Sequence, residues 1–255
     1  PIEPREPIEG EIAINSAEDL AKIGKEKGYP LNGSYLQMSD IDLSEYSKDE
    51  GWVPIGFPYD KYNNYDSSLS FTGNFDGNGF KIRNLYINRP DTDYQGLFGR
   101  TNRATITNIS LENVNVTGGS YTGGLVGETW SSTITNSYAT GSVTGKSFTG
   151  GLVGSAMNSS TITNSYATGA VTVTGTSIVG GLVSYASSST ITNSYWNKET
   201  SGRSTSSGGT GLTTSQMKQK SSYNTWNFDT IWQINEGQSY PYLKSNPQSP
   251  PPGTN

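Results

Sequence analysis

One pattern of apolar and polar residues recurs along the middle of this chain at a nearly constant spacing. Each unit carries an apolar phrase such as Gly-Leu-Val-Gly and, a few residues later, a Thr-Ile-Thr-Asn tetrad. A fixed period of this length indicates stacked units, which cannot bury an apolar face alone and share one core with their neighbours. The isoleucine of the tetrad returns after 28, 28 and 29 residues, at Ile106, Ile134, Ile162 and Ile191.

The alternation within each unit predicts short β-strands. Successive side chains of a strand point to opposite faces, so each isoleucine is expected inside and its flanking threonines outside. Glycine and asparagine separate the strands, as the corners of a coil require. We therefore predict an all-β fold, a parallel β-helix or solenoid whose repeat coils span residues 94–197. The four isoleucines should form one interior column, and the asparagine that ends each tetrad should stack at a corner.

The pattern changes at the N-terminal side of the array. Residues 11–28 carry a helix signal, with Ser16 as N-cap and Gly28 as the closing residue. A short helix here is expected to cap the open edge of the sheet. Residues 35–87 alternate in the manner of strands, so residues 11–93 are predicted to be the N-terminal cap and first coils.

Residues 198–244 break the period and are predicted to be a C-terminal cap. A Ser/Thr/Gly-rich loop leads to a short helix in which Thr213 and Gln216 have the spacing of a capping box. The tryptophan-rich segment from residue 226 to 243 predicts an aromatic hairpin that plugs the far edge. One continuous domain, residues 11–244, would thus lie between the Pro-rich ends.

Those ends, residues 1–10 and 245–255, are predicted to be stiff extended linkers that favour polyproline conformation over packing. The chain is interpreted as a monomeric module within a longer multidomain chain. Its 255 residues include no Cys, which fits an exported bacterial protein. No apolar run approaches the roughly 20 residues that would cross a bilayer.

Composition removes several classes of function. Lys and Arg number 17 against 22 Asp and Glu, with no basic block, which argues against nucleic acid and anionic membrane as partners. The absence of His removes the commonest metal ligand and neutral-pH acid or base. Between residues 113 and 197 only Glu128 and Lys146 are charged, whereas a polysaccharide hydrolase or lyase needs several carboxylates or cations on one face. We predict that the chain is not an enzyme.

A family resemblance strengthens this interpretation. The phrases at residues 122–127 and 149–154, each followed by Ile-Thr-Asn-Ser-Tyr-Ala-Thr-Gly, resemble the GLUG repeat of bacterial surface proteins. The lead-in Trp52-Val-Pro-Ile-Gly56 and the closing Tyr240-Pro-Tyr-Leu243 are similar to the flanks of such proteins. The resemblance implies a right-handed β-helix in a large secreted or wall-anchored protein, often adhesin-like. It implies no catalytic residues.

Two sets of aromatic residues are candidates for ligand binding. The first set should form an outward row, one ring per coil, that stacks against sugar rings; alternatively it is a cross-strand ladder worth about 0.2–1 kcal/mol per pair. The second set lies in and near a polar loop, where it binds a ligand or merely covers the apolar edge. The first set is Tyr138, Tyr166 and Tyr195, and the second is Trp52, Tyr59, Tyr62 and Tyr65.

Two further hypotheses concern polar side chains. Asp76, Asn78, Asp40 and Asp42 offer oxygens to Ca²⁺, the one cofactor considered, although they lack the full spacing of a calcium loop. The alternative is a Gly-rich turn whose aspartate bonds its own backbone. The Thr-x-Thr column presents paired hydroxyls that could order ice, or it reflects the β-propensity of threonine on a solvated face.

These observations favour a non-catalytic structural or adhesive module of a secreted or cell-surface bacterial protein. The alternative is a carbohydrate-binding module that uses exposed Tyr and Trp. A polysaccharide-degrading enzyme and an ice-binding surface rank below both. The partner expected is a polysaccharide or a host-cell or cell-surface glycan, with neither nucleic acid nor membrane.

Overall fold

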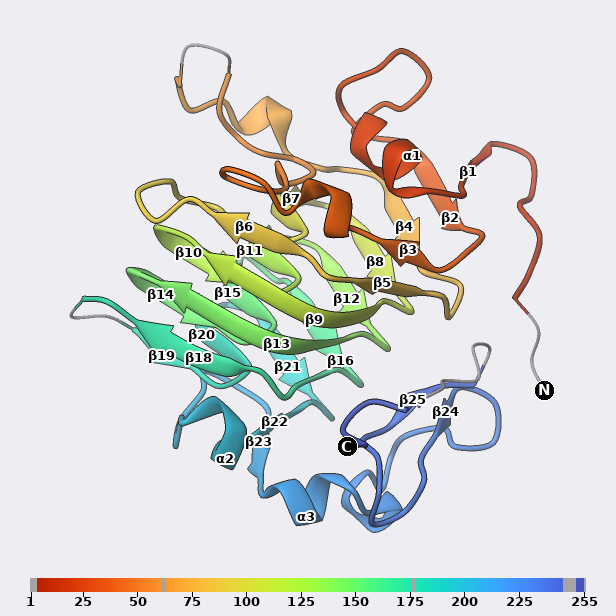
Figure 1. Ribbon diagram of the computed structural model, residues 1–255, viewed down its shortest axis with the longest axis vertical. Helices are drawn as coiled ribbons and strands as arrows, with labels where there is room; N and C mark the ends of the chain where they lie inside the picture. Colours follow the sequence, from red (N-terminus) through yellow and green to blue (C-terminus); the bar gives the residue numbers. More distant parts are fainter. Residues whose placement is uncertain (1–3, 61–62, 176–177, 245–250, 255) are drawn as a thin grey trace.

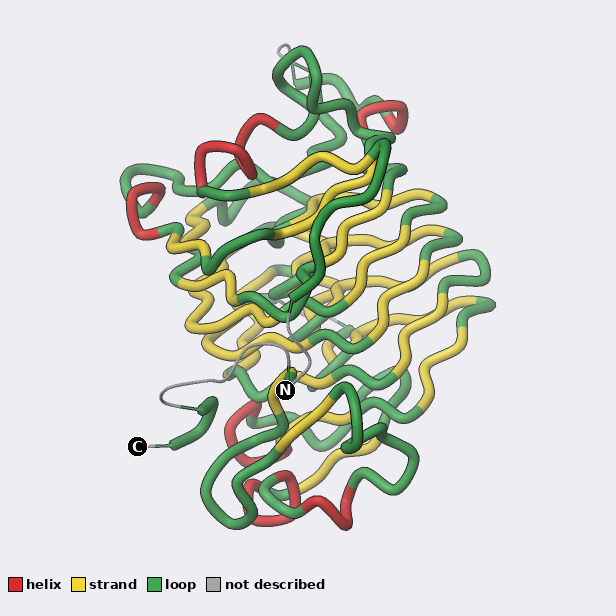
Figure 2. The backbone as a smooth tube through the Cα atoms, turned by 90° about the vertical axis from the view of Figure 1, so that its right-hand side faces the viewer, coloured by secondary structure: helices red, strands yellow, loops and turns green. Residues whose placement is uncertain are grey.

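The chain winds into a stack of coils built from short parallel strands (Figure 1). The computed structural model describes residues 4–60, 63–175, 178–244 and 251–254. Seen from the side, the coils lie one beneath another, with strands of successive coils aligned (Figure 2). The predicted β-solenoid is confirmed.

One sheet carries the tetrads along the length of the stack. Its strands pair in parallel, and Ile106, Ile134 and Ile162 are directly opposite one another and fully buried. Ile191 continues this interior column and is partly buried because it lies in the last coil. The predicted column is confirmed. The strands, in spatial order, are β1 (Glu11–Ile14), β2 (Ser34–Gln37), β4 (Asn74–Asp76), β8 (Thr105–Thr107), β12 (Thr133–Thr135), β16 (Thr161–Thr163) and β21 (Thr190–Thr192).

Three further groups of parallel strands complete the coils. The largest group comprises β3 (Ile41–Asp42), β5 (Lys81–Arg83), β6 (Tyr86–Asn88), β9 (Ser110–Thr117), β13 (Tyr138–Gly145), β17 (Tyr166–Ala167), β18 (Ala170–Val173), β22 (Tyr195–Asn197) and β23 (Thr210–Leu212). A second comprises β7 (Phe98–Asn102), β11 (Val126–Trp130), β15 (Val153–Met157) and β20 (Val183–Ser187). The third comprises β10 (Ser120–Gly123), β14 (Ser147–Gly150) and β19 (Val179–Gly180).

The corners explain the polar residues of the repeat. Asparagines 108, 136, 164 and 193 all have positive φ, a conformation that Asn tolerates better than most residues. The side chain of Asn136 donates to that of Asn108 over 3.3 Å, so the predicted stacking at a corner is confirmed for this pair. The glycine pairs are needed because coils approach closely there: a Cβ on Gly151 would lie 2.4 Å from the carbonyl oxygen of Gly181 in the next coil.

The N-terminal end differs in part from the prediction. Helix α1 (Ala17–Lys22) begins at Ser16, whose hydroxyl accepts from the backbone of Asp19 as expected of an N-cap. Residues 11–14 are a strand instead, because β1 pairs with β2 and this pairing outweighs local helix propensity. Short 3₁₀ turns, η1 (Ser44–Tyr46) and η2 (Ser67–Leu69), follow in the loops of this end.

The C-terminal segment has the predicted elements, but its hairpin packs on the side of the stack and not on its end. It contains α2 (Lys198–Ser201), α3 (Thr214–Met217) with the expected capping box, η3 (Lys220–Ser222), and an antiparallel hairpin of β24 (Trp232–Gln233) and β25 (Tyr242–Leu243). The hairpin and its aromatic neighbours pack on the side of the coils against Tyr138 and Tyr166. The loop at residues 202–211 covers the end instead: Ser206 accepts from the backbone N–H groups of Leu182 and Val183.

The prediction of unpacked linkers is wrong for the parts of both ends that the structure describes. The backbone N–H and C=O of Arg5 both bond the side chain of Asn78, and its guanidinium pairs with Glu11. At the other end, Tyr240 donates its backbone N–H to the carbonyl of Pro252 over 2.8 Å, and Pro252 is buried. These prolines lie against folded partners, which supply contacts that composition alone does not show.

Candidate functional site

The first predicted aromatic row forms but is not exposed. Tyr138 and Tyr166 stack with centroids 4.9 Å apart and planes 6° apart, yet both are fully buried. Trp226 and Trp232 of the C-terminal segment contact their rings, and the Tyr166 hydroxyl donates to the carbonyl of Pro241. Tyr195, the third member, is partly covered by Tyr223 and Trp226. The expectation of an outward-facing ligand surface here is therefore wrong, because the cap covers it.

The second predicted set of aromatic residues contains both buried and surface members. Trp52 is buried, with the Lys25 ammonium 5.8 Å from its ring centroid, and its indole donates to the carbonyl of Leu97. Tyr59 is partly exposed and Tyr65 is 50% exposed, with ring centroids 6.0 Å apart. Tyr62 lies outside the described residues. Only Tyr59 and Tyr65 of the described members therefore stay at the surface.

The four proposed calcium ligands take part in hydrogen bonds within turns and between segments far apart in the sequence. One Asp76 oxygen accepts from the backbone of Asn78 and the amide of Asn108, and the other pairs with Arg5. Asp40 accepts from the backbone of Lys81, and Asp42 from the backbone of Ser44 and the amide of Asn84. The alternative of an aspartate bonding its own turn thus describes Asp76. Among the described residues, no three Asp or Glu side chains come together to hold a metal ion.

A different aromatic row lies at the surface, at the corner that precedes each apolar phrase. Tyr94, Tyr121 and Phe148 occupy matched positions of successive coils, with Tyr121 within β10 and Phe148 within β14. Tyr94 and Tyr121 stack with centroids 4.9 Å apart and planes 10° apart, and Tyr121 and Phe148 repeat this with 4.9 Å and 3°. All three are partly exposed. We call these three residues the corner row.

The row has neighbours at both ends. Tyr59 and Tyr65 contact Tyr94 with centroids 6.0 and 5.8 Å away. At the other end Phe148 meets Tyr185 edge to face at 5.7 Å. The matched position of the next coil is Ile178, which is 45% exposed. Apolar side chains therefore follow this corner past every coil of the repeat array.

The backbone of the corner row is unusual. Tyr94, Tyr121 and Phe148 have φ of 59°, 56° and 48°, a left-handed conformation that bulky residues rarely adopt. The backbone carbonyls of this bend lie close to the last glycine of the Gly-Leu-Val-Gly phrase. A Cβ on Gly127 would lie 2.7 Å from the carbonyl oxygen of Tyr121, and one on Gly154 would lie 2.8 Å from the carbonyl oxygen of Phe148. The backbone carbonyl of the matching glycine in the preceding coil is closer still, at 2.6 Å for Gly127 and 2.4 Å for Gly154. The second glycine of these two phrases is therefore required by close backbone approach from both the preceding coil and the aromatic corner.

The sequence analysis missed the corner row although a signal for it exists. In three successive units an aromatic residue stands two positions before a glycine, in Tyr94-Gln-Gly96, Tyr121-Thr-Gly123 and Phe148-Thr-Gly150. The spacing between these aromatics is 27 residues each time, from 94 to 121 and from 121 to 148. The sequence alone did not show which of two periodic aromatic columns the C-terminal segment would cover.

A buried ion pair lies close to the corner row. Arg100 of β7 and Glu128 of β11 are neighbours in register, and Nε of the arginine is 2.6 Å from a glutamate oxygen. Arg100 also donates to the hydroxyl of Ser70 and lies over the Trp130 ring. Burial, followed by the negative charge of Glu128, raises the pKa of both Tyr94 and Tyr121 above the ordinary value of tyrosine.

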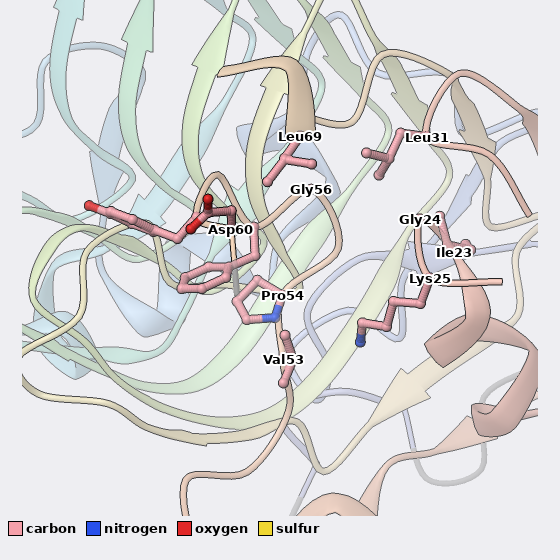
Figure 3. Close-up of a pocket in the computed structure, with 11 residues that line it drawn as sticks. Ile23, Gly24, Lys25, Leu31, Val53, Pro54, Gly56, Asp60 and Leu69 are labelled. Carbon is pink, nitrogen blue, oxygen red and sulfur yellow. The ribbon is translucent and has the colours of Figure 1, made fainter. Parts of the chain in front are cut away.

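A cleft adjoins the row at its N-terminal end. It has a volume of about 680 Å³ and apolar walls that include Leu31, Pro54 and Phe57. Lys25 and Asp60 enter from opposite sides (Figure 3). Tyr59 lines the cleft and also contacts Tyr94, so cleft and corner row form one continuous aromatic surface.

The in-register coils and their common core define the class of protein, a β-solenoid. Its similarity to known sequences identifies the repeat. A family model described as "The GLUG motif" matches residues 118–144 and 149–174, two successive coils. The chain is a β-solenoid in which two successive coils match the GLUG motif.

Two curated relatives share part of this chain. Over 139 residues, or 52% of the chain, it is 36% identical to halomucin from Haloquadratum walsbyi and covers 1% of that protein. Over 98 residues, or 37% of the chain, it is 35% identical to the "Putative Gly-rich membrane protein" of Evansella cellulosilytica and covers 10% of it. The chain thus spans a small fraction of the length of these relatives.

One solved structure resembles the whole chain. It is described as a "putative immunoglobulin A1 protease" from Bacteroides ovatus, with a TM-score of 0.58 and 92% of each chain covered. At 17% identity this likeness shows the fold alone. No helix in the described ranges has the length and apolarity of a bilayer-spanning segment.

Proposed function

We propose that this chain is a non-catalytic structural module of a large extracellular or cell-surface protein. The observation that carries the proposal is the unbroken stack, in which every coil pairs with the next and one core runs from Ile14 to Trp196. Such a stack resists bending because each coil is hydrogen-bonded to both neighbours. The small share of halomucin that the chain matches supports a role as one unit among many.

The charged groups of the repeat coils support a role without catalysis. Glu128 is neutralised by Arg100 and is almost fully buried, so it is poorly placed to act on a substrate. Lys146 pairs with Asp91 at the surface. The outward-facing threonines of β8, β12 and β16, most of them partly buried, form in-register columns, and ice binding by them remains a hypothesis ranked below the structural role.

Pulling the module by its two ends in a force spectrometer tests the structural role. We expect it to extend in steps of about one coil, since each coil contacts mainly its neighbours. Extension as a compliant chain without a resisting force would contradict the proposal. Antibodies against the module should label intact cells that carry the parent protein; labelling only after permeabilisation would overturn its placement outside the cell.

A catalytic role is tested separately. The folded chain is incubated with soluble polysaccharides and with immunoglobulin A1, and the products are followed as new reducing ends and as cleaved protein. We expect neither product to form. Turnover that depends on Asp60, the carboxylate of the cleft, would contradict the non-catalytic assignment.

A further inference from the structure

We propose that the corner row, together with the adjoining cleft, is a binding site for a neutral polysaccharide that runs along the solenoid. This goes beyond the structural role, and its failure would leave that role unaffected. It also differs in place from the row of Tyr138 and Tyr166, which the C-terminal segment covers.

The first argument is conformational. At the corner that follows each tetrad, the left-handed position is held by Asn108, Asn136, Asn164 and Asn193, the residue type that accepts this backbone with least strain. At the corner row the same kind of position holds Tyr94, Tyr121 and Phe148. Bulky rings there strain the backbone, and strained residues of this kind cluster at sites of function. Three matched occurrences in three coils point to a role for the rings themselves.

The second argument concerns which part of each ring is open. Parallel rings in contact have atoms about 3.5–4.0 Å apart. Centroids 4.9 Å apart therefore require each ring to slide sideways over the next, as in the offset stacks that aromatic pairs prefer. The offset leaves a strip of each ring face uncovered, and all three residues are partly exposed. The apolar C–H face of a pyranose can pack on such a strip.

The third argument concerns the length and ends of the surface. The rings extend from Tyr65 through the corner row to Tyr185, at centroid separations of 4.9 to 5.8 Å. This geometry suits an extended chain of sugar rings better than a compact ligand. At the N-terminal end, the cleft places Lys25 and Asp60 on opposite walls, where sugar hydroxyls would find a hydrogen-bond donor and acceptor (Figure 3).

Charge selects the class of polysaccharide. The carboxylate of Asp93 lies near enough to Tyr59 and Tyr121 to raise the pKa of both, after burial. Asp60 and Lys25 line opposite walls of the cleft and offset each other's charge, and the chain carries a formal net charge of −5. The guanidinium of Arg100 is neutralised by Glu128. An acidic polysaccharide would be repelled along this surface, so a neutral one fits.

The test uses native gels that contain one soluble polysaccharide each: mixed-linkage β-glucan, galactomannan, polygalacturonate or alginate. We expect at least one of the two neutral polymers to retard the folded chain and neither acidic polymer to do so. The key variant is Tyr121→Asn with Phe148→Asn, because Asn suits positive φ and should keep the corner folded. We expect this variant to lose at least tenfold in affinity while its unfolding midpoint stays the same or rises.

A matched control is Phe228→Asn, a partly buried aromatic on the C-terminal segment away from the row. It should bind as the unchanged chain does. Equal retardation of the double variant and the unchanged chain would overturn the proposal, as would no retardation by either neutral polymer. Retardation by the acidic polymers alone would overturn the assignment to neutral polysaccharide.

Discussion

Single serines join successive coils at the corner after the tetrad. The hydroxyl of Ser137 accepts the backbone N–H of Ile109 in the coil above and donates to the carbonyl of Thr135 in its own coil. Ser165 repeats both bonds one coil later, to Ser137 and Thr163. Each hydroxyl is buried and satisfied as donor and acceptor. This explains why Ser follows the tetrad in the second, third and fourth units, at Ser137, Ser165 and Ser194, a regularity that apolar patterning does not predict.

Replacing one of these serines should therefore destabilise the fold. Ser137→Ala leaves the buried N–H of Ile109 without its acceptor, and an unsatisfied buried group costs about 1–3 kcal/mol. Chemical denaturation followed by circular dichroism measures the loss. The control Ser215→Ala lies at an exposed helix position and should change stability by less than about 0.5 kcal/mol. Equal losses of unfolding free energy in both variants would show that the hydrogen bond at the corner does not stabilise the fold.

The glycine of the apolar phrase is a residue-scale constraint of another kind. A Cβ on Gly151 would meet the Gly181 carbonyl at 2.4 Å, and both atoms belong to backbone that is fixed by pairing. Gly151→Ala should separate two coils and lower the free energy of unfolding by about 1–3 kcal/mol or more. Gly202→Asn is the control, since its φ of 63° suits Asn and its surroundings are open. A neutral result for Gly151→Ala would mean that the coils can move apart freely.

At the scale of elements, the C-terminal segment matters as a cover for one face. Trp226, Trp232 and Tyr240 enclose the rings of Tyr138 and Tyr166. Burial, assisted by neighbouring groups such as Glu112 beside Tyr138, raises the pKa of both tyrosines well above the ordinary value. Their hydroxyls donate to Glu112 and to the carbonyl of Pro241, bonds that a phenolate could not make.

This burial predicts a loss of stability in alkali. In the unfolded chain the tyrosines titrate near pH 10, while in the folded chain they stay protonated to higher pH. Stability is therefore fully present below about pH 10 and falls above it, by about 1.4 kcal/mol per pH unit for each protected tyrosine. Denaturant titrations from pH 8 to above 10 measure the slope. In Tyr138→Phe with Tyr166→Phe the fall should be shallower; an unchanged slope would show that other groups cause it.

Much of the fold was predictable because the repeat fixes it. Ile106, Ile134 and Ile162 recur at a constant spacing, and all three point into the core. These two facts determine the register of the central strands. The capping box at Thr213 and the hairpin after Trp226 follow from local chemistry in the same way. The packing of these C-terminal elements was not predictable. It depends on which outer face offers complementary rings, and that is a long-range property.

The candidate site shows the same limit. Two columns of aromatics have the period of the coil, one at Tyr138 and Tyr166 and one at Tyr121 and Phe148. In sequence both predict an exposed ladder. The C-terminal segment covers the first and leaves the second partly open, so contacts between residues 60 to 94 positions apart decide which surface can bind.

At the scale of the whole molecule, a stack of parallel strands must close its two open edges. The last coil is closed by the loop at residues 202–211. Ser206 accepts from the N–H groups of Leu182 and Val183, Ser207 donates its backbone N–H to Val183, and Gly208 packs on Ile191. Strand β23 then adds to the edge of β22. A loop without regular structure thus takes the role that was expected of the aromatic hairpin.

Removing this closure should cause copies of the module to assemble end to end. Replacing residues 203–209 with seven glycines takes away Ser206 and exposes the edge of β20, whose unpaired N–H groups can then donate to a strand of another copy. Light scattering after gel filtration, at several protein concentrations, should show mass rising with concentration. Replacing the exposed Glu26 and Lys27 with glycine should leave a monomer. If the loop variant also stays monomeric at every concentration, the last coil is closed by contacts other than this loop.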